Sequence, residues 1–483
     1  MRHRNPPASF ILGKSARTCI PLAVLAATPL VVATLAAADG QRGHAALLQR
    51  LQVQPDRSSP QVIVAEYEAH EPTHSARNQT FGTQVALSGD GRTMAVTDLW
   101  YYGGPVWPWY GSGAVYVYSR IEGGWELQAK LEPPDARGYD FFGSDLAFST
   151  DGDTLAVGAQ YEGYDAPSQE AGPGAVFVFT RSAGQWSQQS VVRSPHPQDD
   201  ASFGRSVELD ARGRVLAVGA PYEAIRSEQG ELQQAGAAYV FEKKGAAWIA
   251  RETLAAPASE RHDRFGLGLR LSEDGRTLAI LAGEQNDATY DPVTGAWPDR
   301  NNTVYVYERT PDWTLQAQFE GAPDDTMLGG DGFDYEGQVE GFDLSGDGRT
   351  LAIASPYARA ADGESGLVRF YRRLGRHWTP AGQVVPSLSG RVAFGLQVTL
   401  SGDGRTMIAS MQGAEGPYGR PCVVEFSRVA LGWKQSAVME SPAWPAYTSF
   451  GNSLASSWNG RILALGSQSY ATESSSWGAV FVY

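Results

Sequence analysis

The chain has few cysteines and histidines, the residues that form disulfides and build many active sites. It has two cysteines and seven histidines in 483 residues. Cys19 falls in an N-terminal segment that is expected to be removed, so Cys422 would remain alone and no intrachain disulfide can form. The sequence also lacks a Walker loop, a Gly-x-Ser-x-Gly elbow, a kinase signature and a His-Glu-x-x-His zinc motif. Because no disulfide can form, stability must come from the core alone.

Two partial motifs remain, and neither predicts an active site. His70 and His74 have the i, i+4 spacing of zinc ligands on a helix, but they fall at an expected strand end and loop. A Ser-x-Asp-Gly-x-Thr turn is similar to the Asp-box of sialidases, but no Trp follows its Thr, and no pair of catalytic carboxylates can be assigned. No catalytic residue and no cofactor are therefore expected.

Long apolar runs are scarce, and the one that exists lies at the N-terminus. Four basic residues and no acidic one precede residues 20–38, a run that ends in Ala36, Ala37 and Ala38. This pattern predicts a secretory signal peptide over residues 1–38. A retained anchor helix is the alternative, which Pro21 and Pro29 disfavour. We expect an exported protein that is periplasmic, on the outer surface or secreted, without a membrane span after cleavage.

Basic charge is in deficit. The formal net charge is −14, and removal of residues 1–38 would leave 35 Lys and Arg against 53 Asp and Glu. Such a surface repels nucleic-acid phosphates and anionic lipid. We therefore expect no nucleic-acid partner, and we expect the chain to act as a monomer.

Glycine is abundant, and much of it belongs to a repeat. A Phe-Gly pair, followed about seven residues later by a Ser-x-Asp-Gly-x-Thr turn between alternating stretches, predicts a β-hairpin. The fifth copy lacks Phe-Gly but keeps the turn. The copies begin at Phe81, Phe142, Phe203, Phe265, Gln338, Phe394 and Phe450. A glycine that tolerates positive φ occupies the same turn position in every copy: Gly91, Gly152, Gly213, Gly275, Gly348, Gly404 and Gly460.

Each copy continues into a third strand such as Gly113–Tyr118 and, in the first six copies, a fourth that opens at a Trp such as Trp125. Four strands per copy predict an all-β, seven-bladed β-propeller with four antiparallel strands per blade over residues 61–483, after a linker over 39–60. The seventh copy stops after its third strand. Residues 61–72 are therefore expected to complete the last blade and close the ring.

The repeated residues carry a family likeness. Phe-Gly, then Val157-Gly-Ala159 and Val218-Gly-Ala-Pro221, then strands like Gly174–Phe179, resemble the FG-GAP repeats of integrin α-subunit propellers and of many bacterial exported proteins. Integrin-type calcium blades carry an Asp-x-Asp-x-Asp-Gly loop. Here the loop is Ser-Gly-Asp-Gly-Arg-Thr with one acid, so the resemblance implies the fold without the calcium sites.

The loops between second and third strands should emerge on one face, and they are rich in aromatic residues that could stack on sugars or peptides. Packing of these rings against one another is the alternative. The candidate binding residues are Trp100, Tyr101, Tyr102, Trp107, Trp109, Tyr110, Tyr161, Tyr222 and Tyr357. An acidic insertion is better explained as a solvated, flexible loop, but it offers weak candidates for a metal site: Asp324, Asp331, Asp334 and Glu336.

Three functions are compatible with these features. The first is a non-catalytic binding or scaffold propeller outside the cytoplasm that engages a protein or glycan through its loop face. The second is a propeller enzyme, a hydrolase or lyase acting on glycans. The third is a purely structural envelope protein. The sequence offers no convergent acid and base for the second, so the first is our prediction.

Overall fold

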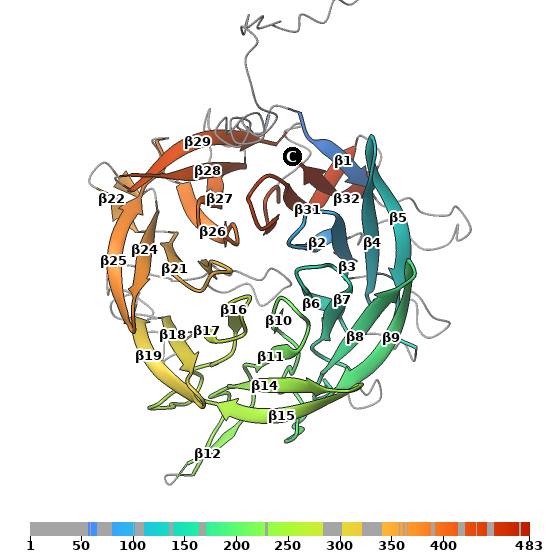
Figure 1. Cartoon of the computed structure of the whole chain (residues 1–483), viewed down its shortest axis with the longest axis vertical. Helices are drawn as coiled ribbons and strands as arrows, with labels where there is room; N and C mark the ends of the chain where they lie inside the picture. Colours follow the sequence, from blue (N-terminus) through green and yellow to red (C-terminus); the bar gives the residue numbers. More distant parts are fainter. Residues whose placement is uncertain are drawn as a thin grey trace, which may run out of the picture. The chain divides into compact units, whose positions relative to one another are not determined.

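The computed structural model describes residues 57, 59–64, 80–99, 101, 111–134, 139–163, 171–227, 230–283, 302–320, 341–356, 358–360, 363–364, 366–387, 392–413, 421–430, 432–441, 449–472 and 475–483. Every regular element in these ranges is a β-strand. The strands form seven four-stranded antiparallel sheets within one compact unit, Pro55–Tyr483. Figure 1 shows the sheets around a common centre, with β6, β10 and β16 innermost and β9, β15 and β25 at the rim. The predicted seven-bladed propeller is confirmed.

The first four blades run from the centre to the rim in chain order. Blade 1 comprises β2 (Phe81–Leu87), β3 (Thr93–Asp98), β4 (Ala114–Ile121) and β5 (Gly124–Leu131). Blade 2 comprises β6 (Phe142–Phe148), β7 (Thr154–Ala159), β8 (Ala175–Ser182) and β9 (Gln185–Val192). Blade 3 comprises β10 (Val207–Leu209), β11 (Val215–Ala220), β14 (Ala237–Lys244) and β15 (Ala247–Leu254). Blade 4 comprises β16 (Gly268–Leu271), β17 (Thr277–Ala282), β18 (Thr303–Arg309) and β19 (Trp313–Glu320).

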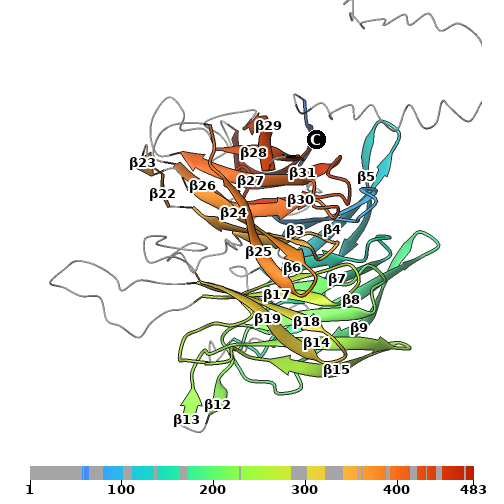
Figure 2. The same cartoon turned by 60° about the vertical axis from the view of Figure 1, so that its left-hand side comes forward.

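The remaining blades follow the same order except at the end of the ring. Blade 5 comprises β20 (Phe342–Leu344), β21 (Thr350–Ser355), β24 (Leu367–Leu374) and β25 (His377–Val384). Blade 6 comprises β26 (Val392–Leu400), β27 (Thr406–Gly413), β28 (Cys422–Val429) and β29 (Gly432–Glu440). Blade 7 comprises β30 (Ser453–Ser456), β31 (Leu463–Thr472), β32 (Ser475–Val482) and β1 (Gln61–Val64). Two short hairpins are β12 (Ile225–Ser227) with β13 (Gly230–Leu232), seen in Figure 2, and β22 (Arg359–Ala360) with β23 (Gly363–Glu364).

The seventh sheet takes its outer strand from the N-terminal side of the unit. β1 pairs antiparallel with β32, from Gln61 opposite Val482 to Val64 opposite Ala479. Residues 65–72, which we expected to belong to the same strand, lie outside the described residues. No helix in the described part of the chain is long and apolar enough to cross a membrane.

Arg57, just before β1, makes structural contacts that were not expected of a linker residue. Its Nε lies 2.9 Å from Glu425 Oε2 of blade 6, and both side chains are almost fully buried. The same guanidinium donates to the carbonyl oxygens of Gly460, at 2.7 Å, and Arg461, at 3.1 Å, in blade 7. One side chain therefore ties the N-terminal segment to two blades.

The turn between the first and second strands explains the polar residues of the repeat. In blade 1, Ser88 Oγ donates to Asp90 Oδ1 at 2.6 Å and accepts the Thr93 N–H at 2.9 Å. Asp90 Oδ1 also accepts the Arg92 N–H at 2.9 Å, while Gly91 adopts a φ of 68°. All seven predicted turn glycines have positive φ. Serine and aspartate thus satisfy the turn amides, and glycine permits its conformation.

The core lies between neighbouring blades. Phe142, the aromatic residue of a Phe-Gly pair, is fully buried in a cluster with Val115 and Val117 of blade 1. Phe342 takes this place in the fifth copy, which lacks Phe-Gly, and packs with blade 4. A Cβ at Gly268 would lie 2.9 Å from the Phe342 ring, so the glycine leaves room for this ring.

Candidate functional site

The antiparallel topology places the connections of each blade at two ends. The turns from first to second strand and from third to fourth strand emerge at one end, which we call the turn face. The loops from second to third strand, together with the connections to the next blade, emerge at the other end, which we call the loop face. The innermost strands line a central channel between the two.

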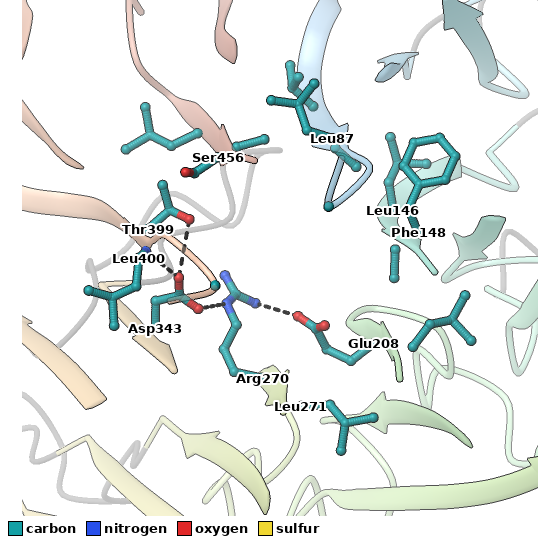
Figure 3. Close-up of a pocket in the computed structure, with 18 of the residues that line it drawn as sticks. Leu87, Leu146, Phe148, Glu208, Arg270, Leu271, Asp343, Thr399, Leu400 and Ser456 are labelled. Carbon is teal, nitrogen blue, oxygen red and sulfur yellow. Dashed lines mark hydrogen bonds and ion pairs between the residues drawn. The ribbon is translucent and has the colours of Figure 1, made fainter. Parts of the chain in front are cut away.

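The channel holds a small set of buried charges. Its cavity has a volume of about 240 Å³ and is lined by the innermost strands of all seven blades. Arg270 of β16 points into it between Glu208 of β10 and Asp343 of β20 (Figure 3). Arg270 Nε lies 3.0 Å from Asp343 Oδ1, and Nη1 lies 3.4 Å from Glu208 Oε1. Both carboxylates therefore face a common cation.

The Asp343 side chain joins blade 5 to blade 6 through hydrogen bonds. Its Oδ2 accepts the Leu400 N–H at 2.6 Å and the Thr399 hydroxyl at 3.2 Å, and its Oδ1 accepts the Leu344 N–H at 2.8 Å. Burial raises the pKa of Asp343, although Arg270 and these donors act in the opposite direction. The carboxyl group thus has a complete set of structural partners.

Other innermost strands use the same device. A side-chain oxygen near the end of a Phe-Gly segment accepts a backbone N–H from the next blade, which joins the two strands without a sheet between them. These contacts run from Val207 N–H to Asp145 (2.7 Å), from Leu269 N–H to Ser206 (3.0 Å) and from Val85 N–H to Ser453 (2.9 Å). The polar lining of the channel is therefore largely structural.

The turn end of the channel is held together by backbone hydrogen bonds between neighbouring turns. In the described residues they run from Trp458 to Gly89, Thr150 to Ala211, Ala211 to Glu273, Glu273 to Gly346, Asp347 to Gly402 and Asp403 to Trp458, at 2.8–3.1 Å. The Trp458 indole covers Gly402, where a Cβ would lie 1.8 Å from its ring. Glu273 Oε1 accepts the Thr150 hydroxyl at 2.9 Å, and burial raises the pKa of Glu273.

Three of the nine predicted aromatic binding residues are described, and each comes from the second-to-third-strand loop of a different blade. Tyr101, Tyr161 and Tyr222 belong to blades 1, 2 and 3 and are all half-buried. The remaining six lie outside the described residues: Trp100, Tyr102, Trp107, Trp109, Tyr110 and Tyr357. So do the acidic residues considered for a metal, namely Asp324, Asp331, Asp334 and Glu336. In the described residues, no group of three His, Cys, Asp or Glu could hold a metal ion.

Each of the three rings rests on a neighbour. Lys130 Nζ lies 3.6 Å from the centroid of the Tyr101 ring, and the Arg264 guanidinium carbon lies 5.1 Å from that of Tyr222. The Tyr161 ring lies 5.3 Å from Phe141. These contacts support rings whose residues are only half-buried.

The described residues at the start of these loops are also held through the backbone. The Tyr161 N–H donates to the Asp140 carbonyl at 3.3 Å, and the Tyr222 N–H donates to the Ala201 carbonyl at 3.2 Å. In each case the acceptor lies in the connection from the preceding blade. Beside Tyr222, the buried Glu223 accepts the Tyr239 hydroxyl at 2.6 Å, and burial raises the pKa of Glu223.

Left-handed backbone recurs in these connections. In blades 2, 3 and 4, two residues of the segment just before Phe-Gly have φ between 49° and 70°, although none is glycine: Tyr139 and Phe141, Asp200 and Ser202, and His262 and Arg264. Such conformations persist where surrounding contacts enforce them, and they concentrate at functional sites. These conformations could not be predicted from the sequence, because the side chains at these positions differ in every copy.

Comparison with known proteins identifies one repeat. A model of the FG-GAP repeat family matches residues 125–179, which run from β5 into β8, the third strand of blade 2. No curated protein sequence gives a significant match. Among solved structures, hydrazine synthase of Kuenenia stuttgartiensis is similar at 11% identity and a TM-score of 0.48, covering 83% of this chain and 96% of that one. A likeness at this level carries no argument about function.

Proposed function

We propose that this FG-GAP repeat β-propeller is a non-catalytic binding and scaffold module that acts outside the cytoplasm and holds a protein or glycan on its loop face. The location rests on the signal peptide predicted over residues 1–38. The ligand class rests on the loop face, and the absence of catalysis rests on the channel.

The repeated presentation of aromatic rings carries the proposal. Tyr161 and Tyr222 occupy corresponding loops of adjacent blades, and both are half-buried and hydrogen-bonded to the preceding connection. A ring that is already ordered loses little entropy on binding, so it contributes contact area at low cost. Aromatic faces stack on sugars and on peptide segments alike. A row of such rings fits an extended ligand better than a single small molecule.

The channel supports a binding role over the alternative, a glycan hydrolase or lyase. Such an enzyme needs one carboxyl group that can donate a proton and another that can accept one or attack. Asp343 and Glu208 both face Arg270, and Asp343 also has three structural donors. These contacts favour a joint between blades over an acid and base pair.

The test is binding of the purified mature chain to immobilised glycans and to exported proteins of its source. A Tyr161→Ala, Tyr222→Ala variant, shown by circular dichroism to be folded, should lose a specific ligand that the unmodified chain retains. Leu374→Ser is the matched control, because Leu374 is a 59% exposed apolar residue on the turn face. Equal capture by all three proteins would contradict the proposal, and glycan turnover by the unmodified chain would favour the enzyme.

A further inference from the structure

The turn face carries a row of basic residues at one position of the repeat. Each lies near the end of the third strand, where its N–H donates to the carbonyl of the residue after the turn glycine at 2.8–2.9 Å. The row comprises Arg120, Arg181, Lys243, Arg309, Arg373 and Arg428. In a chain of net charge −14, this regular placement of positive charge calls for counter-ions.

Two joints supply the counter-ion from the preceding blade. Arg309 of blade 4 pairs with Glu242 of blade 3, and Arg373 of blade 5 pairs with Glu308 of blade 4. Arg373 also donates to the Thr277 hydroxyl at 3.1 Å, which fixes its direction across the joint. In each case the glutamate immediately precedes the basic residue of its own blade: Glu242 precedes Lys243, and Glu308 precedes Arg309.

The next joint replaces this glutamate with an arginine. Strand register shows that the three positions are equivalent. Glu242, Glu308 and Arg372 each precede the basic residue that pairs with the Trp of the fourth strand. Arg428 of blade 6 therefore meets Arg372 where its counterparts meet a carboxylate. The joint between blades 5 and 6 therefore has a positive charge where the other two joints have a negative one.

The local charges around Arg428 agree with this geometry. Burial and the nearby Arg372 and Arg405 lower the pKa of Arg428, and the carboxylate of Asp347 opposes them. Across the described ranges, the guanidinium groups of Arg372, Arg405 and Arg428 make no hydrogen bond or ion pair. Three arginines thus share a joint without a bonded carboxylate, and because Arg372 and Arg405 are exposed, the joint is open to an anion from solution.

We propose that Arg372, Arg405 and Arg428 form a binding site for a tetrahedral oxyanion, the phosphate or sulfate group of a ligand. Guanidinium groups are rigid forks that bind such groups through paired hydrogen bonds. At the two joints with a glutamate, Arg276 and Arg349 occupy the position of Arg405, so two arginines share one carboxylate there. Three arginines match a group with more acceptor oxygens and more charge. The site lies on the turn face, so it is separate from the loop-face ligand and does not depend on it.

The experiment is calorimetric titration of the mature chain with inorganic phosphate and, separately, with sulfate, at constant ionic strength maintained with chloride. Arg372→Glu installs the glutamate of the other joints, so it should pair with Arg428 and reduce affinity for both anions at least tenfold while the protein stays folded. Arg428→Gln should cause a similar loss. Arg376→Glu is the matched control, because it makes the same charge change at an exposed position of the adjacent turn.

The proposal predicts saturable binding of either anion by the unmodified chain and by Arg376→Glu. A preference for one anion would assign the ligand group as a phosphate or as a sulfate ester. No saturable binding of either anion by the unmodified chain would overturn the proposal. Equal affinity in Arg372→Glu and Arg376→Glu would also overturn it, because a general charge effect would then explain the binding.

Discussion

At the scale of single residues, some glycines are required by their surroundings and others only by their backbone. Gly113 has a φ of 85°, and a Cβ there would lie 2.1 Å from the carbonyl oxygen of Phe142 in the next blade. Gly123 has a φ of 94° in an outer turn, but a Cβ there meets nothing within 4 Å. Comparing Gly113 with Gly123 therefore distinguishes the cost of a steric clash from the cost of a left-handed backbone.

We expect Gly123→Ala to lower the free energy of unfolding by about 1 kcal/mol, the usual cost of a left-handed alanine. Gly113→Ala should lower it by about 3 kcal/mol or more, because the blade joint must also move apart. Urea unfolding of both variants measures the difference. Equal losses would mean that the joint adapts, contrary to the close packing described here.

Glu273 gives a pH-dependent prediction. Burial raises its pKa above the ordinary value of 4.5, so its contribution to stability is fully present below that pH and is lost as the pH rises through the folded-state pKa. Glu273→Gln removes the charge but keeps an acceptor for Thr150. The variant should therefore melt at a higher temperature than the unmodified chain at pH 7, and the difference should disappear near pH 4. A variant that is less stable at pH 7 would contradict this account.

At the scale of elements, the repeat made the hairpins and outer strands predictable. Phe-Gly, the turn and the Trp strand recur at fixed spacing, and each reports a local requirement. The register shift between third and fourth strands was not predictable, although it recurs after Val117, Val178 and Val240, among others. A bulge of this kind is set by the twist that each blade needs, and no special residue marks it.

Contacts between distant segments escaped prediction for a related reason. Arg57 and Glu425 are 368 positions apart, and nothing in either local sequence links them. Arg270, Glu208 and Asp343 come from three copies at corresponding positions where the repeat is not conserved. Their meeting in the channel follows from ring closure, which the sequence suggests but does not place in three dimensions.

Arg57 allows a direct test of how the N-terminal segment is attached. Arg57→Ala leaves Glu425, whose side chain is 3% exposed, without its cation, so we expect a loss of about 3 kcal/mol in the free energy of unfolding. Adding Glu425→Gln should recover part of this loss, because the amide carries no charge to bury. Thermal and urea unfolding of the single and double variants form the cycle. A double variant no more stable than Arg57→Ala would argue against the buried ion pair.

At the scale of the whole molecule, the two faces of the ring have different characters. The loop face presents half-buried aromatic rings on backbone held by the adjacent connection. The turn face presents a regular row of basic residues whose counter-ions are supplied by the preceding blade at two joints and replaced by arginine at another. The channel between them is lined by polar groups that join the blades. The proposed loop-face ligand and the proposed anion site therefore lie on opposite faces of the ring.

The most direct test of this account is the affinity of one captured ligand for three proteins: the unmodified chain, the Tyr161→Ala, Tyr222→Ala variant and Leu374→Ser. Binding through the loop face predicts at least a tenfold loss of affinity in the tyrosine variant and an unchanged value in Leu374→Ser, since each aromatic contact contributes about 1 kcal/mol or more. An unchanged affinity in the tyrosine variant, or an equal loss in Leu374→Ser, would contradict the assignment of the loop face as the binding surface.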